Sequence, residues 1–119
     1  MPIKTFTDLD VYNLSHELAM EIFHLSKGFP GEEKYSLIDQ VRRSSRSVAV
    51  NIAEGWGKRV YPANFKRHLV DSNGSLEETK SWLMFSKDCD YISNDQFQSL
   101  IIKTENVGGK LWKLHDSWT

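Results

Sequence analysis

Seven basic side chains in one segment have the types and spacing that suit binding chemistry: Arg42, Arg43, Arg46, Lys58, Arg59, Lys66 and Arg67. Set against Glu54, the single acid between residues 42 and 68, these seven bases give the segment a net charge of +6, although the whole chain carries −1. Lysine and arginine neutralise phosphates, so this segregation predicts an anion-binding surface whose natural ligand is nucleic acid. Trp56 and Tyr61 are interleaved with these residues and could stack on unpaired bases.

The same charges have a structural interpretation, which leaves a protein-interaction scaffold without nucleic-acid binding as the alternative. Arg42 and Arg46 flank the expected apolar face of their helix. Across the bundle, Glu77 or Glu78 could pair with either of them. Acids four residues before a base also form ion pairs within a helix. The sequence contains two such pairs, Asp39–Arg43 and Glu54–Lys58.

Metal ligation is the next chemistry to weigh, because four-helix bundles often hold metals between their helices. Glu21 and His24 have the Glu-x-x-His spacing of di-iron bundles, but such a site needs two copies of the motif and the chain has one. His16 and Glu17 are not followed by a second histidine at the interval of a zinc-protease motif. We therefore expect no metal site and no cofactor.

Residues for covalent catalysis are also missing from the sequence. Cys89 has Asp88 and Asp90 beside it, and neighbouring carboxylates disfavour the reactive thiolate. The glycines at 55 and 57 are too few for a phosphate-binding loop. We expect no catalytic residues, no enzyme activity and no small-molecule substrate.

Four helical segments must position these residues, at about 8–27, 32–56, 62–88 and 94–118. Pro62 suits a first helical turn, and Ser93 with Gln96 forms a capping box. No segment shows the alternation of a strand. The expected fold is all-α, with residues 1–119 forming a single antiparallel up-down-up-down four-helix bundle domain. Gly108 and Gly109 leave open whether the fourth helix breaks there.

The first helix has a wider apolar surface than a monomeric bundle usually needs. Its two apolar stripes together span about 200° of the helix, compared with a little over ~100° for a typical bundle helix. Trp82 and Phe85 also point away from the core line of the third helix. We expect an oligomer whose interface between copies consists of Val11, Leu14, Leu18, Ile22, Leu25, Trp82 and Phe85.

Polar residues form a narrow line along the second helix: Gln40, Ser44, Ser47, Asn51 and Glu54. Against another helix, this line would form a hydrogen-bonded seam that sets register and stoichiometry, whereas against water it would be a plain solvated face. Interior glycines at 74, 108 and 109 predict close backbone contacts, because each glycine costs about 1 kcal/mol in a helix relative to alanine.

The composition favours a cytoplasmic protein. The longest apolar run, residues 82–85, is far below the ~20 residues that a membrane helix needs. The N-terminal residues turn polar before the apolar region of a secretion signal could form. The single cysteine, Cys89, excludes an internal disulfide and fits a reducing compartment. We expect no membrane partner.

Residues 40–55, QVRRSSRSVAVNIAEG, resemble the signature of the four-helix bundle family encoded in intervening sequences of bacterial 23S ribosomal RNA genes. The likeness spans nearly the whole chain. Ala49 departs from the signature, because many relatives have proline there, and it implies a straighter second helix. Supporting matches are FTDLDVY at 6–12, FP at 29–30, EKYSL at 33–37 and GSLEE at 74–78.

The resemblance implies an antiparallel four-helix bundle that assembles as a homopentamer. Relatives include proteins similar to the accessory variability determinant of diversity-generating retroelements, a basic pentamer that binds nucleic acid and a reverse transcriptase. The resemblance brings no catalytic residues. It is compatible with binding of RNA or a ribonucleoprotein through the basic segment.

Overall fold

The computed structural model describes residues 2–119, and its regular structure is helical throughout. No strand occurs in this part of the chain. Two short 3₁₀ turns, η1 (Phe6–Asp8) and η2 (Gly31–Glu33), precede the first and second long helices. The long helices are α1 (Asp10–Ser26), α2 (Leu37–Gly57), α3 (Pro62–Asp88) and α4 (Asn94–Ser117). The expected all-α class with four helices is confirmed.

Two helices begin where the sequence predicts. Pro62 occupies the first turn of α3, where its missing N–H costs no helical hydrogen bond. The capping box of α4 is present: Ser93 Oγ accepts from the Gln96 backbone N–H at 3.0 Å, and Gln96 Oε1 accepts from the Ser93 backbone N–H at 2.8 Å. These bonds satisfy backbone donors that the first helical turn leaves without partners.

The other two helices begin later than the sequence predicts. α1 begins at Asp10 instead of residue 8, because the Asp8 carboxylate accepts two backbone N–H groups of the preceding residues and closes the η1 turn. α2 begins at Leu37 instead of residue 32. Ser36 has non-helical backbone angles (φ −121°, ψ −100°) and its hydroxyl donates to the Glu33 carboxylate, so a local side-chain bond competes with helix formation.

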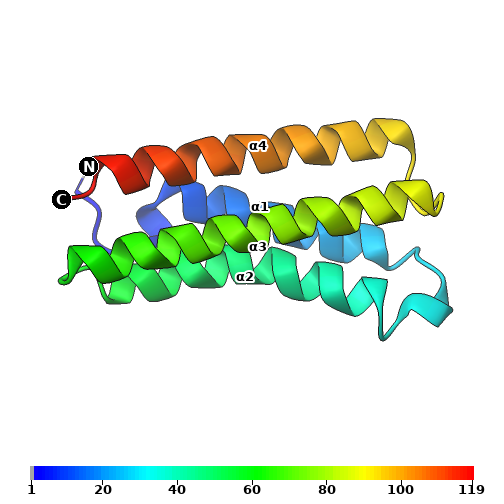
Figure 1. The fold of residues 1–119 in the computed structure, drawn as a ribbon, viewed down its shortest axis with the longest axis horizontal. Coiled ribbons are helices and arrows are strands. Elements are labelled where there is room, and N and C mark those ends of the chain that lie inside the picture. Colours follow the sequence, from blue (N-terminus) through cyan, green and yellow to red (C-terminus); the bar gives the residue numbers. More distant parts are fainter. Residues whose placement is uncertain (1) are drawn as a thin grey trace.

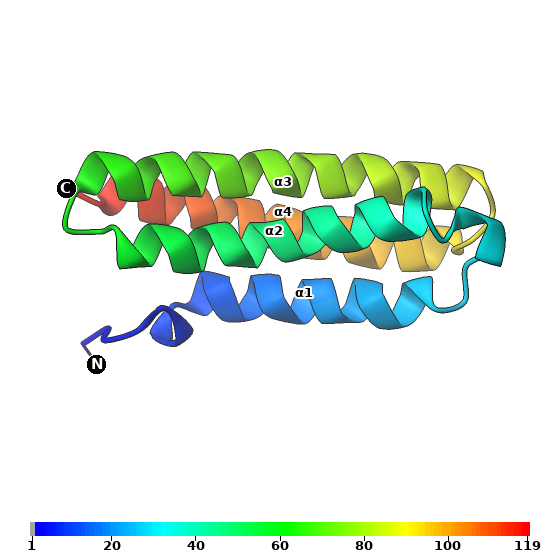
Figure 2. The same cartoon turned by 90° about the horizontal axis from the view of Figure 1, so that it is seen from below.

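Figures 1 and 2 show the four helices side by side along the longest axis, with consecutive helices joined at alternate ends of the molecule. α2 packs against α1 and α3, and α4 packs against α3 and α1. α4 continues without a break through residues 108–109. α2 is one continuous helix through Ala49.

The wide apolar surface of α1 is covered within a single copy of the chain. Val11, Leu18 and Ile22 are buried, with 4%, 3% and 1% of their surface exposed. Leu14 and Leu25 are half-buried against the same core. One copy of the chain already buries Val11, Leu18 and Ile22, so the prediction that they form the surface between copies is wrong. Contact of Leu14 and Leu25 with another copy stays a prediction. A corner helix needs two apolar stripes, because it packs against two neighbours, here α2 and α4.

Two residues of the predicted interface do reach the surface. Phe85 is 54% exposed and Trp82 is half-buried, and their rings lie 5.8 Å apart on the outer side of α3. The Trp82 indole Nε1 donates to the Glu78 carboxylate at 3.0 Å. Burial of exposed apolar surface is favourable, so these two rings remain candidates for contact with another molecule.

Candidate nucleic-acid interface

The seven basic residues divide into two groups at different heights along the bundle. The arginine cluster consists of Arg42, Arg43 and Arg46 in the first half of α2. The turn cluster consists of Lys58, Arg59, Lys66 and Arg67, around the connection between α2 and α3. At 1.5 Å per residue, the twelve residues from Arg46 to Lys58 separate the two groups by about 18 Å.

Arg42 and Arg46 lie against α1 and not against α3. The Arg42 Nε donates to Ser26 Oγ at 2.8 Å, and its guanidinium carbon lies 4.7 Å from the centre of the Phe23 ring. The Arg46 guanidinium lies 5.7 Å from the same ring. The prediction that either pairs with Glu77 or Glu78 is wrong. Within residues 2–119, neither arginine has a carboxylate within 4.0 Å.

Arg43 pairs with Glu78, which was expected to pair with Arg42 or Arg46. It lies about 100° around α2 from Arg42, so it faces α3, where it forms an ion pair with Glu78. Its Nε also donates to Gln40 Oε1 at 3.2 Å, and the predicted pair with Asp39 is not formed. The Arg43 side chain is 55% exposed, so water screens the ion pair and part of the guanidinium remains accessible.

In the turn cluster, Lys58 forms the predicted ion pair with Glu54, and Arg59 covers the ring of Trp56. Lys58 Nζ lies 3.6 Å from Glu54, as the four-residue spacing predicts. Arg59 stacks 4.1 Å above the Trp56 ring and donates to the Trp56 carbonyl at 2.9 Å. Trp56 is only 6% exposed, so the prediction that it stacks on a base is wrong, whereas Tyr61 is 66% exposed.

His68 joins the turn cluster, although no local sequence pattern pointed to it. Its Nδ1 lies 3.2 Å from Asn51 Oδ1 and its Nε2 lies 3.1 Å from Lys58 Nζ. Asn51 uses its Nδ2 to donate to the Ser47 carbonyl, so its Oδ1 is free to accept from His68 Nδ1–H. In neutral His68 the Nε2 is then an acceptor for the Lys58 ammonium.

A close approach of α2 and α3 places His68 there. A Cβ built on Gly55 would lie 2.7 Å from the His68 Cβ and 3.1 Å from Phe65 Cδ1, so only glycine leaves room for this contact. The close contacts predicted at residues 74 and 109 are absent, since nothing lies within 4 Å of a Cβ built at either position. At Gly108 the nearest atom, 3.4 Å away, belongs to Leu76.

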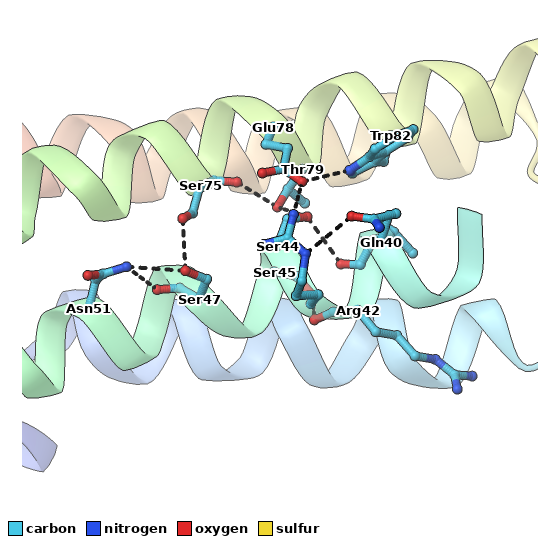
Figure 3. A network of polar contacts seen from close by, with 12 residues as sticks. Gln40, Arg42, Ser44, Ser45, Ser47, Asn51, Ser75, Glu78, Thr79 and Trp82 are labelled. Carbon is cyan, nitrogen blue, oxygen red and sulfur yellow. Dashed lines mark hydrogen bonds and ion pairs between the residues drawn. The ribbon is translucent and has the colours of Figure 1, made fainter. Parts of the chain in front are cut away.

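The polar line of α2 is a seam against α3 within the same chain (Figure 3). Thr79 Oγ1 lies 2.9 Å from the buried Ser44 Oγ, and the hydroxyls of Ser47 and Ser75 lie 2.9 Å apart. Ser44, Ser47 and Asn51 therefore form the interhelical seam, which is one of the two alternatives left by the sequence. Gln40 instead bonds to Arg43 of its own helix, and Glu54 is exposed. Every buried side-chain nitrogen and oxygen among the described residues has a hydrogen-bond partner. The seam fixes the register of α2 against α3, and this register sets the position of the two basic clusters along the bundle axis.

The arginine cluster borders a surface hollow of about 650 Å³ beside the start of α2. Tyr35 is the one aromatic residue among its lining residues, and 86% of its surface is accessible. Lys34 and Tyr35 were missed as site residues because the sequence analysis placed both inside the second helix and confined the basic segment to residues 42–68, whereas both lie in the turn before α2. We call this site the arginine hollow, and its lining residues are Lys34, Tyr35, Ile38, Asp39, Arg42, Arg43, Arg46, Ser47 and Val50.

Other residues with potential chemistry do not converge. Glu21 forms an ion pair with Lys103 at 2.7 Å, and His24 is exposed beside Phe23. In residues 2–119, no three histidine, cysteine, aspartate or glutamate side chains are placed to hold a metal ion. Cys89 is a free, exposed thiol. None of the described helices is long and apolar enough to cross a membrane.

Comparison with known proteins places this geometry in a family. The model of the 23S rRNA-intervening sequence protein family matches residues 7–113. Among solved structures, the chain is similar to a protein with unknown function from the S23 ribosomal protein family of Bacteroides thetaiotaomicron. The TM-score is 0.81 at 26% sequence identity, and the match covers 90% of this chain and 96% of that one. No curated protein matches the chain.

Proposed function

The chain belongs to the 23S rRNA-intervening sequence protein family, and we propose that it is a non-enzymatic, cytoplasmic protein that binds RNA, free or in a ribonucleoprotein. In this proposal an up-down-up-down antiparallel bundle is the unit of a homo-oligomer, with a pentamer implied by the family resemblance. RNA contacts the arginine cluster and the turn cluster defined above.

The observation that carries the proposal is the number of basic groups without an acidic partner. Two of the seven basic residues, Arg43 and Lys58, form ion pairs with carboxylates of the described chain. The other five have no carboxylate within 4.0 Å there. Three of these, Arg42, Arg46 and Arg59, are held against aromatic rings. A stacked guanidinium keeps donors at its edge for a phosphate and is already ordered before it binds.

Titration of labelled RNA with the purified protein at about 50 and 200 mM salt tests the proposal. We expect binding that weakens steeply with salt, because each neutralised phosphate releases counterions. The charge reversals Arg46→Glu and Arg67→Glu should each weaken binding and reduce the salt dependence. Lys113→Glu on α4 changes the net charge equally, outside both clusters, and should have a smaller effect. Absence of binding at about 50 mM salt would remove the proposal.

A second candidate function, a protein-interaction scaffold, is favoured by one apolar surface. Leu37, Trp82, Phe85 and Cys89 border a hollow of about 620 Å³ near the start of α2 and the end of α3. Under this alternative another protein covers these side chains and the arginines serve the fold. Charge reversal at Lys58 and Arg59 would then leave capture of the partner intact, whereas Phe85→Glu would abolish it.

A further inference from the structure

We propose that the arginine hollow binds one unpaired nucleotide of a single-stranded segment, with the base on Tyr35 and its phosphate on the arginines. This inference rests on the proposed function and goes beyond it by naming the form of nucleic acid that is recognised. It also adds Lys34 and Tyr35 to the site, although neither belongs to the basic segment seen in the sequence.

Tyr35 has the exposure and position of a stacking platform. Its side chain lies in the turn before α2 and is 86% exposed. A side chain that packed against the fold or bonded to it would be less exposed. Lys34 Nζ lies over the Tyr35 ring, 5.4 Å from its centre, and adds a positive charge at one face of the ring. An aromatic side chain beside cations is the usual combination for an unpaired base and its phosphate.

The rest of the lining divides into a basic side and an apolar side. Arg42 and Arg46 supply guanidinium groups without acidic partners in the described chain, and Arg42 is oriented by Ser26. Ile38, at the start of α2 close to Tyr35 in the chain, supplies apolar surface, which suits the face of a base better than a phosphate.

Asp39 is the one acid among the lining residues, and no lysine or arginine of the described chain pairs with it. Its carboxylate can accept a hydrogen bond from an exocyclic amino group or a ribose hydroxyl. The hollow therefore offers a separate partner for each part of a nucleotide.

A base pair cannot use these partners together. In a duplex, both faces of a base are covered by its neighbours in the stack, so Tyr35 would reach only the backbone. A single strand exposes the base face, and stacking on an aromatic ring is tolerant of base identity. The site is consequently expected to favour single strands over duplexes without strong preference for sequence.

Fluorescence anisotropy with labelled strands of about ten nucleotides tests this inference. The probes are one RNA strand, its duplex, and a DNA strand of the same sequence, each against wild type, Tyr35→Ala, Tyr35→Phe and Tyr61→Ala. We expect Tyr35→Ala to weaken single-strand binding about tenfold and to change duplex binding little. Tyr35→Phe keeps the ring and should retain binding. Circular dichroism checks that each variant is folded.

The outcomes separate this inference from the proposed function. If no RNA binds, both fail. If RNA binds but duplex equals single strand, or Tyr61→Ala weakens binding and Tyr35→Ala does not, the proposed function stands and the hollow is not the site. If polyglutamate binds as tightly as RNA, and Tyr35→Ala does not change its affinity, the surface binds acidic proteins and the inference is overturned. Selective loss with Tyr35→Ala supports it, and the RNA and DNA strands show whether the ribose hydroxyl contributes.

Discussion

Gly55 shows how one missing side chain sets the contact between two helices. Its absent Cβ makes room for the His68 Cβ, which in turn brings the His68 ring to Asn51 and Lys58. An interior glycine costs a helix about 1 kcal/mol relative to alanine, and the close contact with α3 offsets that cost. By contrast, Gly74 is exposed, and a methyl group added there would have no atom within 4 Å.

These two glycines give opposite predictions for the same substitution. Gly55→Ala should lower the free energy of unfolding by about 1–3 kcal/mol, because the added methyl group forces α2 and α3 apart. Gly74→Ala should raise it by up to about 1 kcal/mol, because the methyl group meets open space and the helix gains propensity. Urea unfolding of both variants measures the difference. A Gly55→Ala variant as stable as wild type would contradict the close contact.

Tyr91 and Glu33 form a hydrogen-bonded pair in which folding shifts the pKa of both side chains. The Tyr91 hydroxyl donates to Glu33 at 2.9 Å, which with burial raises the pKa of Tyr91 to about 12. Hydrogen bonds from Ser36 and then Tyr91 lower the pKa of Glu33 below its ordinary value of 4.5. The Tyr91 contribution to stability is therefore present below pH 10 and lost as the pH rises toward 12, whereas that of Glu33 is lost as the pH falls below 4.5.

The Tyr91→Phe variant tests this bond directly. We expect it to be less stable than wild type at pH 7, because the hydrogen bond to Glu33 is lost. The difference between the two proteins should shrink as the pH rises from 10 toward 12, since wild-type Tyr91 then loses its proton. Denaturant midpoints of both proteins across this range provide the measurement, and a constant difference would exclude the Tyr91–Glu33 bond as its source.

At the scale of the elements, the α2–α3 contact contains a line of buried hydroxyl groups beside its apolar residues. Ser44, Ser72 and Thr79 have no exposed surface, and Ser72 Oγ donates across the contact to the Val48 carbonyl at 2.7 Å. Short hydroxyl side chains let two helices approach closely, and each needs a partner because an unsatisfied buried hydroxyl is costly. The register of α2 against α3 is thereby specified, and with it the placement of Arg43 opposite Glu78.

A double-mutant cycle at Ser44 and Thr79 tests the seam. Ser44→Ala and Thr79→Val should each lower the free energy of unfolding by about 1 kcal/mol, because one interhelical bond is lost while the remaining hydroxyl keeps a backbone acceptor. The double variant should lose less than the sum, since the second substitution finds the bond already broken. Strict additivity in urea unfolding would show that the two hydroxyls do not interact.

At the scale of the whole molecule, a single copy covers its core but leaves apolar side chains in water. One copy already buries Val11, Leu18 and Ile22 of α1, so assembly would have to bury other side chains. The most exposed large apolar residues are Tyr35, Val50, Val60, Tyr61, Met84, Phe85 and Ile102. Of these, Met84 and Phe85 lie outside the arginine hollow and next to Trp82 on α3, and together with the family resemblance they support the proposed homo-oligomer.

Light scattering at low micromolar concentration tests the assembly. We expect a mass several times the 13.8 kDa of one chain, and Phe85→Glu should lower it, because a buried charge would oppose contact at this surface. Ile102→Glu on α4 is the matched control and should leave the mass unchanged. A wild-type particle of 13.8 kDa would overturn the assembly, and dissociation by Ile102→Glu alone would move the interface to α4.

Properties that depend on neighbours in the chain could be read from the sequence. The four helices, the capping box at Ser93 and the Glu54–Lys58 pair each involve residues a few positions apart, so local spacing was enough to predict them. The delayed start of α2 was missed because a single bond between Ser36 and Glu33 outweighed helix propensity there.

Which side of a helix meets which neighbour was decided by packing. Apolar periodicity showed that α1 had two buried faces, but it could not show whether α2 and α4 or another copy would cover them. Likewise, the arginines were visible as charges, yet their partners depend on how α2 is rotated between α1 and α3: Arg42 meets Phe23 and Arg43 meets Glu78. Contacts between residues far apart in the chain arise only when the helices have docked, and the hydrogen bond from Ser72 Oγ to the Val48 carbonyl is one of them.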